Sequence, residues 1–214
     1  KIIRAASHLL ETGPEDLVVE DGKVSVVGTD RALTFRQLAR AVYLEMRRIP
    51  ADKREELAST KTYDPVFGTS ATAAHLAVVE INPDTLEIKL ERFVVAEDCG
   101  RLINPMIVDG QVHGGVAQGI GAALYEEVVY NDEGQNVTAS LVDYIIPTAT
   151  EIPPIEVVHI EAASLTTLGG FRGMGEGGTI GAPAAVANAV ADAVAPLGID
   201  ILELPVSPER LFRL

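Results

Sequence analysis

Hydrophobic and polar positions in the first 60 residues predict a helix, a hairpin and a second helix. Over residues 1–11 the hydrophobic side chains fall on one helical face, which indicates an amphipathic helix. The pair Asp21-Gly22 separates two short alternating segments, a combination typical of a β-hairpin. Thr34, with Gln37 three residues later, predicts a capping box that starts the second helix.

The pattern changes after the polar stretch 47–60, which we expect to be a connection or a mobile loop. Strand patterns follow at residues 73–81, 86–96, 128–130, 140–145 and 155–161. The alanine-rich stretch 182–195 predicts a helix with Pro183 in its first turn, where proline is tolerated. The chain is therefore expected to have an α+β fold of mixed strand pairs and helices, divided into residues 1–60 and 61–214.

Charge and cysteine content narrow the possible partners. The 214 residues include 17 Lys and Arg against 31 Asp and Glu, a net charge of −14. This balance disfavours nucleic acid and anionic membrane surfaces, which attract clustered basic side chains. The single cysteine, Cys99, excludes an internal disulfide, an iron–sulfur cluster and a Cys-rich zinc site within the chain. We expect a cytoplasmic location, and the start at Lys1 without an initiator Met indicates a processed subunit or a fragment.

A loop at residues 169–181 is the most unusual feature of the sequence. It holds seven glycines around one carboxylate, Glu176, and a predicted helix follows it. Such glycine density indicates sharp turns or a close approach of the backbone to another group. One alternative is a flexible surface loop with a solvated Glu176. Another is a dinucleotide loop at 173–178, but that motif requires a preceding strand and an acidic residue about 20 positions later.

A second segment, residues 109–121, combines glycines with the amides of Gln111 and Gln118. Amides that donate and accept hydrogen bonds suit a flat heterocycle with ring nitrogens and carbonyls. The alternative is close helix packing through small residues. The glycines of this segment make a helix through 111–115 doubtful. His113 is expected to have a structural role. In a third segment, 97–105, we expect Arg101 to pair with a carboxylate.

These segments, together with three shorter ones, closely resemble the C-terminal region of the large subunit of molybdenum hydroxylases. That family includes xanthine dehydrogenase, the aldehyde oxidoreductases and the aerobic carbon monoxide dehydrogenases. The resemblance is carried, in fixed order, by residues 95–105, 110–121, 124–127, 143–149, 173–183 and 205–210. It implies that the chain is the C-terminal portion of a molybdenum-cofactor-binding subunit.

The resemblance also implies a chemistry and a set of site residues. The family hydroxylates an aldehyde, an N-heterocycle or a similar small substrate with water-derived oxygen, and Glu176 matches its base. The cofactor is molybdenum–molybdopterin, with the cytosine dinucleotide as one form. By resemblance, the cofactor-binding residues are Gln111, Gln118, Gly114, Gly115, Gly175 and Gly177.

The resemblance implies partners as well. Iron–sulfur and FAD groups are expected only on partner chains or domains, beside the remainder of the molybdenum subunit. The family's other glycine-rich cofactor loop has no match in these residues, so we expect the chain alone to be inactive. Two alternatives stay open: a catalytically silent scaffold of the same fold, and a reductase of the hydroxybenzoyl-coenzyme A reductase kind.

Overall fold

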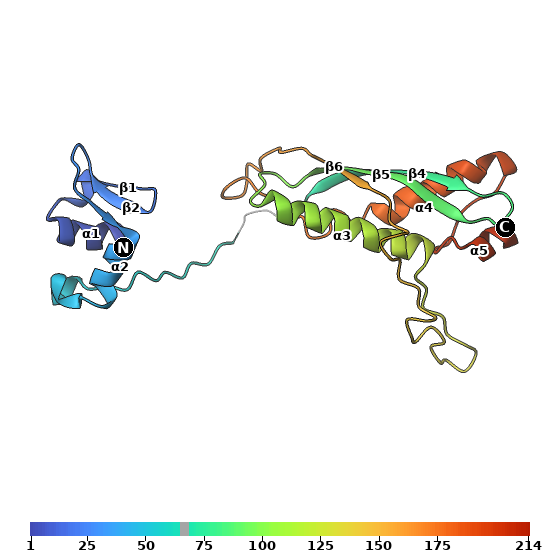
Figure 1. Ribbon diagram of the computed structural model, residues 1–214, viewed down its shortest axis with the longest axis horizontal. Coiled ribbons are helices and arrows are strands. Elements are labelled where there is room, and N and C mark those ends of the chain that lie inside the picture. The colour runs from blue at the N-terminus through green and yellow to red at the C-terminus, as the bar shows by residue number, and fades with distance from the viewer. Residues whose placement is uncertain (65–68) are drawn as a thin grey trace. The chain divides into compact units, whose positions relative to one another are not determined.

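The computed structural model describes residues 1–64 and 69–214, which divide into two compact units, Lys1–Asp64 and Pro65–Leu214. Strands and helices occur in both units, as the sequence predicted for an α+β fold (Figure 1). No helix among the described residues is both long and apolar enough to cross a membrane.

The first unit contains two helices and a small antiparallel sheet of order β1-β2-β3. Its principal elements, in chain order, are α1 (Ile2–Leu10), β1 (Leu17–Glu20), β2 (Lys23–Val26), β3 (Ala32–Thr34) and α2 (Phe35–Tyr43). The expected hairpin is confirmed: Asp21 and Gly22 both have positive φ, 48° and 71°, at the turn between β1 and β2. The capping box of Thr34 and Gln37 is also confirmed.

The first unit has its own hydrophobic core, centred on Val24, Leu38 and Ile49. Short 3-10 turns connect its elements: η1 (Pro14–Asp16), η2 (Met46–Arg48) and η3 (Ala51–Lys53). Two of these turns, η2 and η3, lie wholly or partly in residues 47–60, which were expected to be a connection or a mobile loop.

The second unit is built on a three-stranded sheet of order β4-β5-β6. Strands β4 (Thr72–Ile81) and β5 (Ile88–Asp98) form a long antiparallel pair with a register shift at Val78/Val79. Strand β6 (Ile155–His159) lies parallel to β5, with Phe93 opposite Ile155 and Glu97 opposite His159. The sequence predicted these strands but not the parallel pairing.

Helices pack on one side of this sheet (Figure 1). They are α3 (Pro105–Leu124), α4 (Ala182–Val194) and the short α5 (Pro208–Arg213), with the 3-10 turn η4 (Ala195–Leu197) after α4. Pro183 lies in the first turn of α4, as predicted. Side chains from the sheet and from α3 and α4 make one core that includes Phe93, Val112 and Val190.

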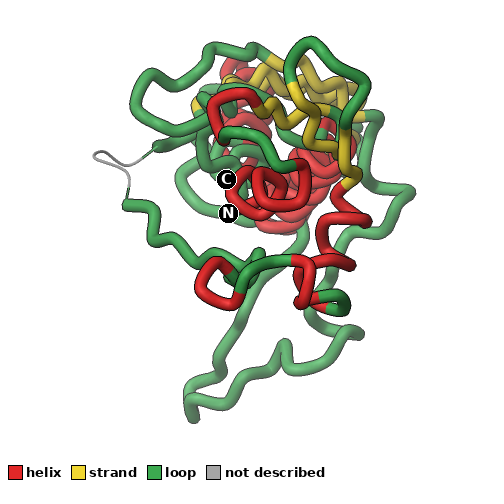
Figure 2. Tube along the Cα trace, turned by 90° about the vertical axis from the view of Figure 1, so that its left-hand side faces the viewer, coloured by secondary structure: helices red, strands yellow, loops and turns green. Residues whose placement is uncertain are grey.

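Two local expectations were wrong. Helix α3 runs unbroken through 111–115, because several of its glycines pack closely against neighbouring segments and this packing offsets their low helix propensity. The expected strand pair at 128–130 and 140–145 is absent from the described chain. Residues 125–154 instead have an isolated bridge between Tyr130 and Asn136, and turns at 140–145. Much of 125–154 extends from the unit as a long loop (Figure 1, Figure 2), where no neighbouring strand is available for pairing.

Candidate functional site

The glycine loop 169–181 lies against helix α3. The side-chain amide of Gln111 donates from Nε2 to the carbonyl oxygen of Gly175 over 2.7 Å. A Cβ placed on Gly178 would lie 2.4 Å from the carbonyl oxygen of Val112, so only glycine fits there without a shift. The structure therefore brings the two glycine-rich segments into direct contact.

Glu176 is exposed in this loop, and its backbone forms a tight turn. Its carbonyl oxygen accepts from the backbone N–H of Thr179 at 3.0 Å and of Ile180 at 3.2 Å. Glu176 is among the residues that line a pocket of about 570 Å³, together with the rest of loop 173–177, residues 69–71 and part of β4, including His75. A carboxylate at the wall of a pocket, on a turn fixed by its own backbone, is placed to accept a proton from a bound group.

The two glutamines lie on the α3 side of the loop and do not line that pocket. Among the residues that the structure describes, the Gln111 side chain binds Gly175, and this contact uses one of its two amide hydrogens and not its oxygen. Gln118 lies further along α3, where its Oε1 is 3.5 Å from the hydroxyl of Thr179. Gln111 is therefore held at the loop more firmly than Gln118.

The four glycines predicted to bind the cofactor fall into two classes. A Cβ on Gly115 would be 2.8 Å from the backbone nitrogen of Thr179, and one on Gly177 would be 3.2 Å from Glu97 Oε2. Close packing within the chain therefore explains why Gly115 and Gly177 have no side chain. A Cβ on Gly114 or Gly175 would meet nothing within 4 Å, so contacts within the chain do not explain why they lack side chains. These two glycines border open space next to Gln111.

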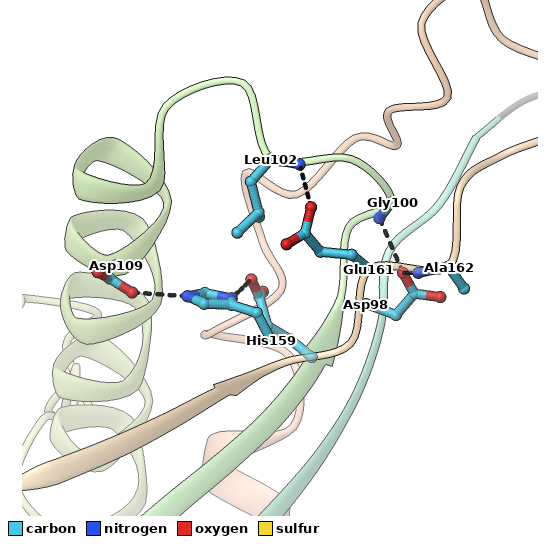
Figure 3. A network of polar contacts seen from close by, with 8 residues as sticks. Asp98, Gly100, Leu102, Asp109, His159, Glu161 and Ala162 are labelled. Carbon is cyan, nitrogen blue, oxygen red and sulfur yellow. Dashed lines mark hydrogen bonds and ion pairs between the residues drawn. The ribbon is translucent and has the colours of Figure 1, made fainter.

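A row of charged groups lies behind the loop, and sequence reasoning missed it. Glu97, at the end of β5, is fully buried, and its Oε1 is 3.1 Å from His159 Nδ1. The other ring nitrogen of His159, Nε2, is 2.7 Å from Asp109 Oδ1 on α3 (Figure 3). The signal was available: Phe93, Val95 and Glu97 alternate along one strand, which places a carboxyl on the inward face.

A second histidine holds the loop from β4. His75 Nε2 is 3.1 Å from the carbonyl oxygen of Gly177, so this nitrogen must carry the proton and donate it. Burial lowers the pKa of His75, and this outweighs the opposite effects of Gly177 and Glu97. A Cβ on Gly181 would lie 2.4 Å from the His75 ring. His75 therefore donates to Gly177 and packs closely against Gly181, on either side of the Glu176 turn.

In the described part of the chain, segment 97–105 does not contain the expected ion pair between Arg101 and a carboxylate; its ion pair involves Asp98. Asp98 accepts from the backbone N–H groups of Gly100 at 2.9 Å and Ala162 at 3.1 Å (Figure 3), and its ion-pair partner is Arg172, at 4.0 Å. Arg101 is exposed instead, and its backbone N–H donates to the carbonyl oxygen of Gly170 at 3.1 Å. Cys99 is buried, as expected of a small apolar side chain.

The remaining predictions concern histidines and metals. His113, expected to be structural, has Nε2 3.2 Å from the carbonyl oxygen of Ile155 and so connects α3 to β6. Within residues 1–64 and 69–214, no group of three or more His, Cys, Asp or Glu side chains has the arrangement of a metal site.

Comparison with known proteins identifies the relatives of the chain. Residues 1–153 match the family model described as a molybdopterin cofactor-binding domain. The chain is 42% identical over 214 residues to the nicotine 6-hydroxylase large subunit of Paenarthrobacter nicotinovorans, covering all of this chain and 26% of that protein. It is 32% identical over 213 residues to the carbon monoxide dehydrogenase large chain of Hydrogenophaga pseudoflava, again covering 26% of it. The chain thus spans about a quarter of the length of these relatives.

Solved structures agree with this. Quinoline 2-oxidoreductase from Pseudomonas putida 86 superposes with a TM-score of 0.88 and 45% identity over 99% of this chain and 27% of its own. A Cu,Mo-CO dehydrogenase superposes with the same TM-score at 32% identity, covering 99% of this chain and 26% of its own.

Proposed function

The chain belongs to the molybdopterin cofactor-binding domain family, and we propose that it forms part of the large subunit of a molybdenum hydroxylase in which Glu176 is the general base. The observation that carries this proposal is the position of Glu176 in the pocket wall, on a glycine turn fixed by Gln111 and His75. The reaction would place water-derived oxygen on an electron-poor carbon of a small substrate.

An N-heterocycle is the substrate class we favour. The relatives at 42% and 45% identity are named for nicotine and quinoline, whereas those named for carbon monoxide are 32–33% identical. Substrate-binding residues outside these 214 positions would complete the choice between an N-heterocycle and an aldehyde.

The residues on the α3 side fit the expected cofactor. The second amide hydrogen and the oxygen of Gln111 could pair with the ring nitrogens and carbonyl of a pterin, and Gly114 and Gly175 leave the adjoining space open. When bound, molybdenum–molybdopterin, in the cytosine dinucleotide or the shorter form, supplies the redox centre. Gln118, Gly115 and Gly177 would hold the loop and helix that form this face.

The chain's own contribution to catalysis is then a proton transfer. The Glu176 carboxylate would accept a proton from the water-derived oxygen as that oxygen bonds to the substrate carbon. The C–H bond at that carbon would break, and its electron pair would pass to the redox centre that the bound cofactor supplies. Iron–sulfur and flavin groups on partner subunits or domains would carry the electrons away. We expect this assembly to be cytoplasmic and the chain alone to be inactive.

The test is Glu176→Gln in the complete enzyme. The change preserves shape, so the fold and the molybdenum content should be nearly intact. Turnover should fall by about 10²–10⁴-fold, the usual contribution of a general base. The matched control is Glu133→Gln, which removes an exposed carboxylate from the turn in 125–154 and should leave the rate unchanged.

Rates and molybdenum are to be measured in the same samples. Full metal content with a normal kcat in Glu176→Gln would reject the assignment of the base. A purified complex that never contains molybdenum would instead support the silent scaffold.

A further inference from the structure

Glu97 is the one charged side chain that is fully buried among the residues that the structure describes. A carboxyl group loses hydration when it is buried, so such a group is retained only where neighbouring charges or hydrogen bonds compensate. Oε1 has such a neighbour in His159, at 3.1 Å. Oε2 is buried without a hydrogen-bond partner in the described chain, and it lies 3.2 Å from the position a Cβ of Gly177 would occupy.

His159 connects this buried group to the surface. Its ring is bracketed by two carboxyl groups, Glu97 on β5 and Asp109 on α3, and its side chain is 20% exposed against 47% for Asp109. Both ring nitrogens face acceptors, so the doubly protonated imidazolium satisfies both contacts. The arrangement is a line of carboxylate, imidazolium and carboxylate that runs from the surface of α3 to the back of the glycine loop.

We propose that Glu97, held by His159 and Asp109, is a positioning residue for Glu176. Glu97 packs against Gly177, which directly follows Glu176, while His75 holds the carbonyl of the same glycine from β4 at 3.1 Å. The Gly177 peptide is thereby fixed between two strands. The inference rests on the proposed role of Glu176 and adds the groups that set where its carboxylate points.

The charge of this line depends on pH through His159. Burial lowers the pKa of His159, but its hydrogen bonds and charge interactions with Asp109 and Glu97 outweigh burial and raise the pKa overall. The other titratable groups facing Glu97 are His75 and Cys99. Burial lowers the pKa of His75, and burial together with Glu97 raises that of Cys99. When pH rises past the pKa of His159, Glu97 loses its counter-charge and the Gly177 peptide should move.

The first test is a nuclear magnetic resonance titration of the whole ¹⁵N-labelled chain, with no cofactor required. The backbone amide signal of Gly177 should shift with the same midpoint as the His159 ring, and His159→Gln should abolish that shift. His113→Gln is the matched control, because it removes the other α3–β6 histidine contact and should leave the Gly177 titration in place. A Gly177 signal that ignores His159 in the parent chain overturns the proposal.

The second test uses the complete enzyme. Glu97→Gln keeps the side-chain shape, so molybdenum content and KM should stay within about twofold. Misplacement of the base should lower kcat by about ten- to a hundredfold. The control, Glu156→Gln, removes an exposed carboxylate paired with Arg92 on the same sheet and should leave kcat unchanged. An unchanged kcat in Glu97→Gln also overturns the proposal.

The two tests distinguish failure of this inference from failure of the proposed function on which it rests. If Glu176→Gln turns over normally, the base assignment fails, while the titration still decides whether His159 moves Gly177. If Glu176→Gln is inactive and Gly177 does not follow His159, the base assignment stands and the positioning role is rejected. Should Glu97→Gln fail to fold, His159→Gln, at a partly exposed side chain, provides the kinetic comparison.

Discussion

Gly114 and Gly110 lie on helix α3, and neither would bring a Cβ within 4 Å of another group. Alanine at either position should stabilise the chain by about 0.5–1 kcal/mol, because glycine is less favourable than alanine inside a helix. In the complete enzyme, Gly114→Ala should also reduce molybdenum content, whereas Gly110→Ala should not. Thermal unfolding of the chain and metal analysis of the enzyme measure the two effects. Equal metal content in both variants would remove Gly114 from the cofactor site.

His159 should give the stability of the second unit a pH dependence of known sign. Its folded pKa is raised above 6.5, so the folded state holds the proton more tightly than the unfolded state does. That contribution is complete below about pH 6.5 and is lost as pH rises through the folded pKa. Urea unfolding midpoints at several pH values should therefore decline above neutrality, and less steeply in His159→Gln.

His75 contributes with the opposite sign. Its folded pKa is lowered, so its contribution to stability is present above the unfolded value and is lost as pH falls toward the folded value. The two histidines together favour the folded second unit most near the ordinary pKa of histidine. A urea midpoint in the parent chain that keeps rising above neutral pH would contradict the prediction for His159.

At the scale of elements, the contact between α3 and the glycine loop depends on backbone touching backbone. Gly178→Ala would place a methyl group 2.4 Å from Val112 O, so the loop must move away from the helix. We expect a loss of about 1–3 kcal/mol, the usual range for overpacking, and loss of the Gln111–Gly175 hydrogen bond. Gly175→Ala, on the same loop with open space around it, is the control for stability. Equal urea midpoints for the two variants would show that the loop tolerates the displacement.

Elements whose signals are local could be predicted from the sequence. The Asp21-Gly22 turn, the Thr34 cap and the helix with Pro183 each depend on a few neighbouring residues, and all three were confirmed. In α3, tertiary contact overrode propensity: Gly115 packs on Thr179, far away in sequence.

Long-range pairing set the limit of prediction for the sheet and the site. The parallel pairing of β6 and the meeting of Glu97 with His159 depend on residues 62 positions apart, which no local pattern encodes. Glu176 and Gln111 were singled out because their glycine-rich surroundings are unusual. Glu97 was not, because a single charge at a strand end resembles an ordinary surface residue. The catalytic and cofactor roles themselves stay predictions.

At the scale of the whole chain, the two units have separate cores, so we expect two unfolding events. Leu38 is fully buried in the first core, and Leu38→Ala should destabilise that unit by about 2–5 kcal/mol. Calorimetry should show one transition moved to lower temperature and the other unchanged. Val190→Ala, in the second core, should move the other transition instead. A single transition displaced equally by both variants would show that the units unfold together.

The contacts that hold the Glu176 turn join residues far apart along the chain: 64 positions for Gln111 and Gly175, and 102 for His75 and Gly177. Closing such long loops is entropically unfavourable and slow, whereas the β4–β5 hairpin closes locally. Refolding should therefore pass through a stage in which the β4–β5 hairpin has formed and the Glu176 turn has not. In pulsed hydrogen exchange, the amides of β4 and β5 would gain protection before the amide of Gly177. Until that last closure the chain would have its hairpin but not the turn that carries Glu176, so the proposed site should form late in folding.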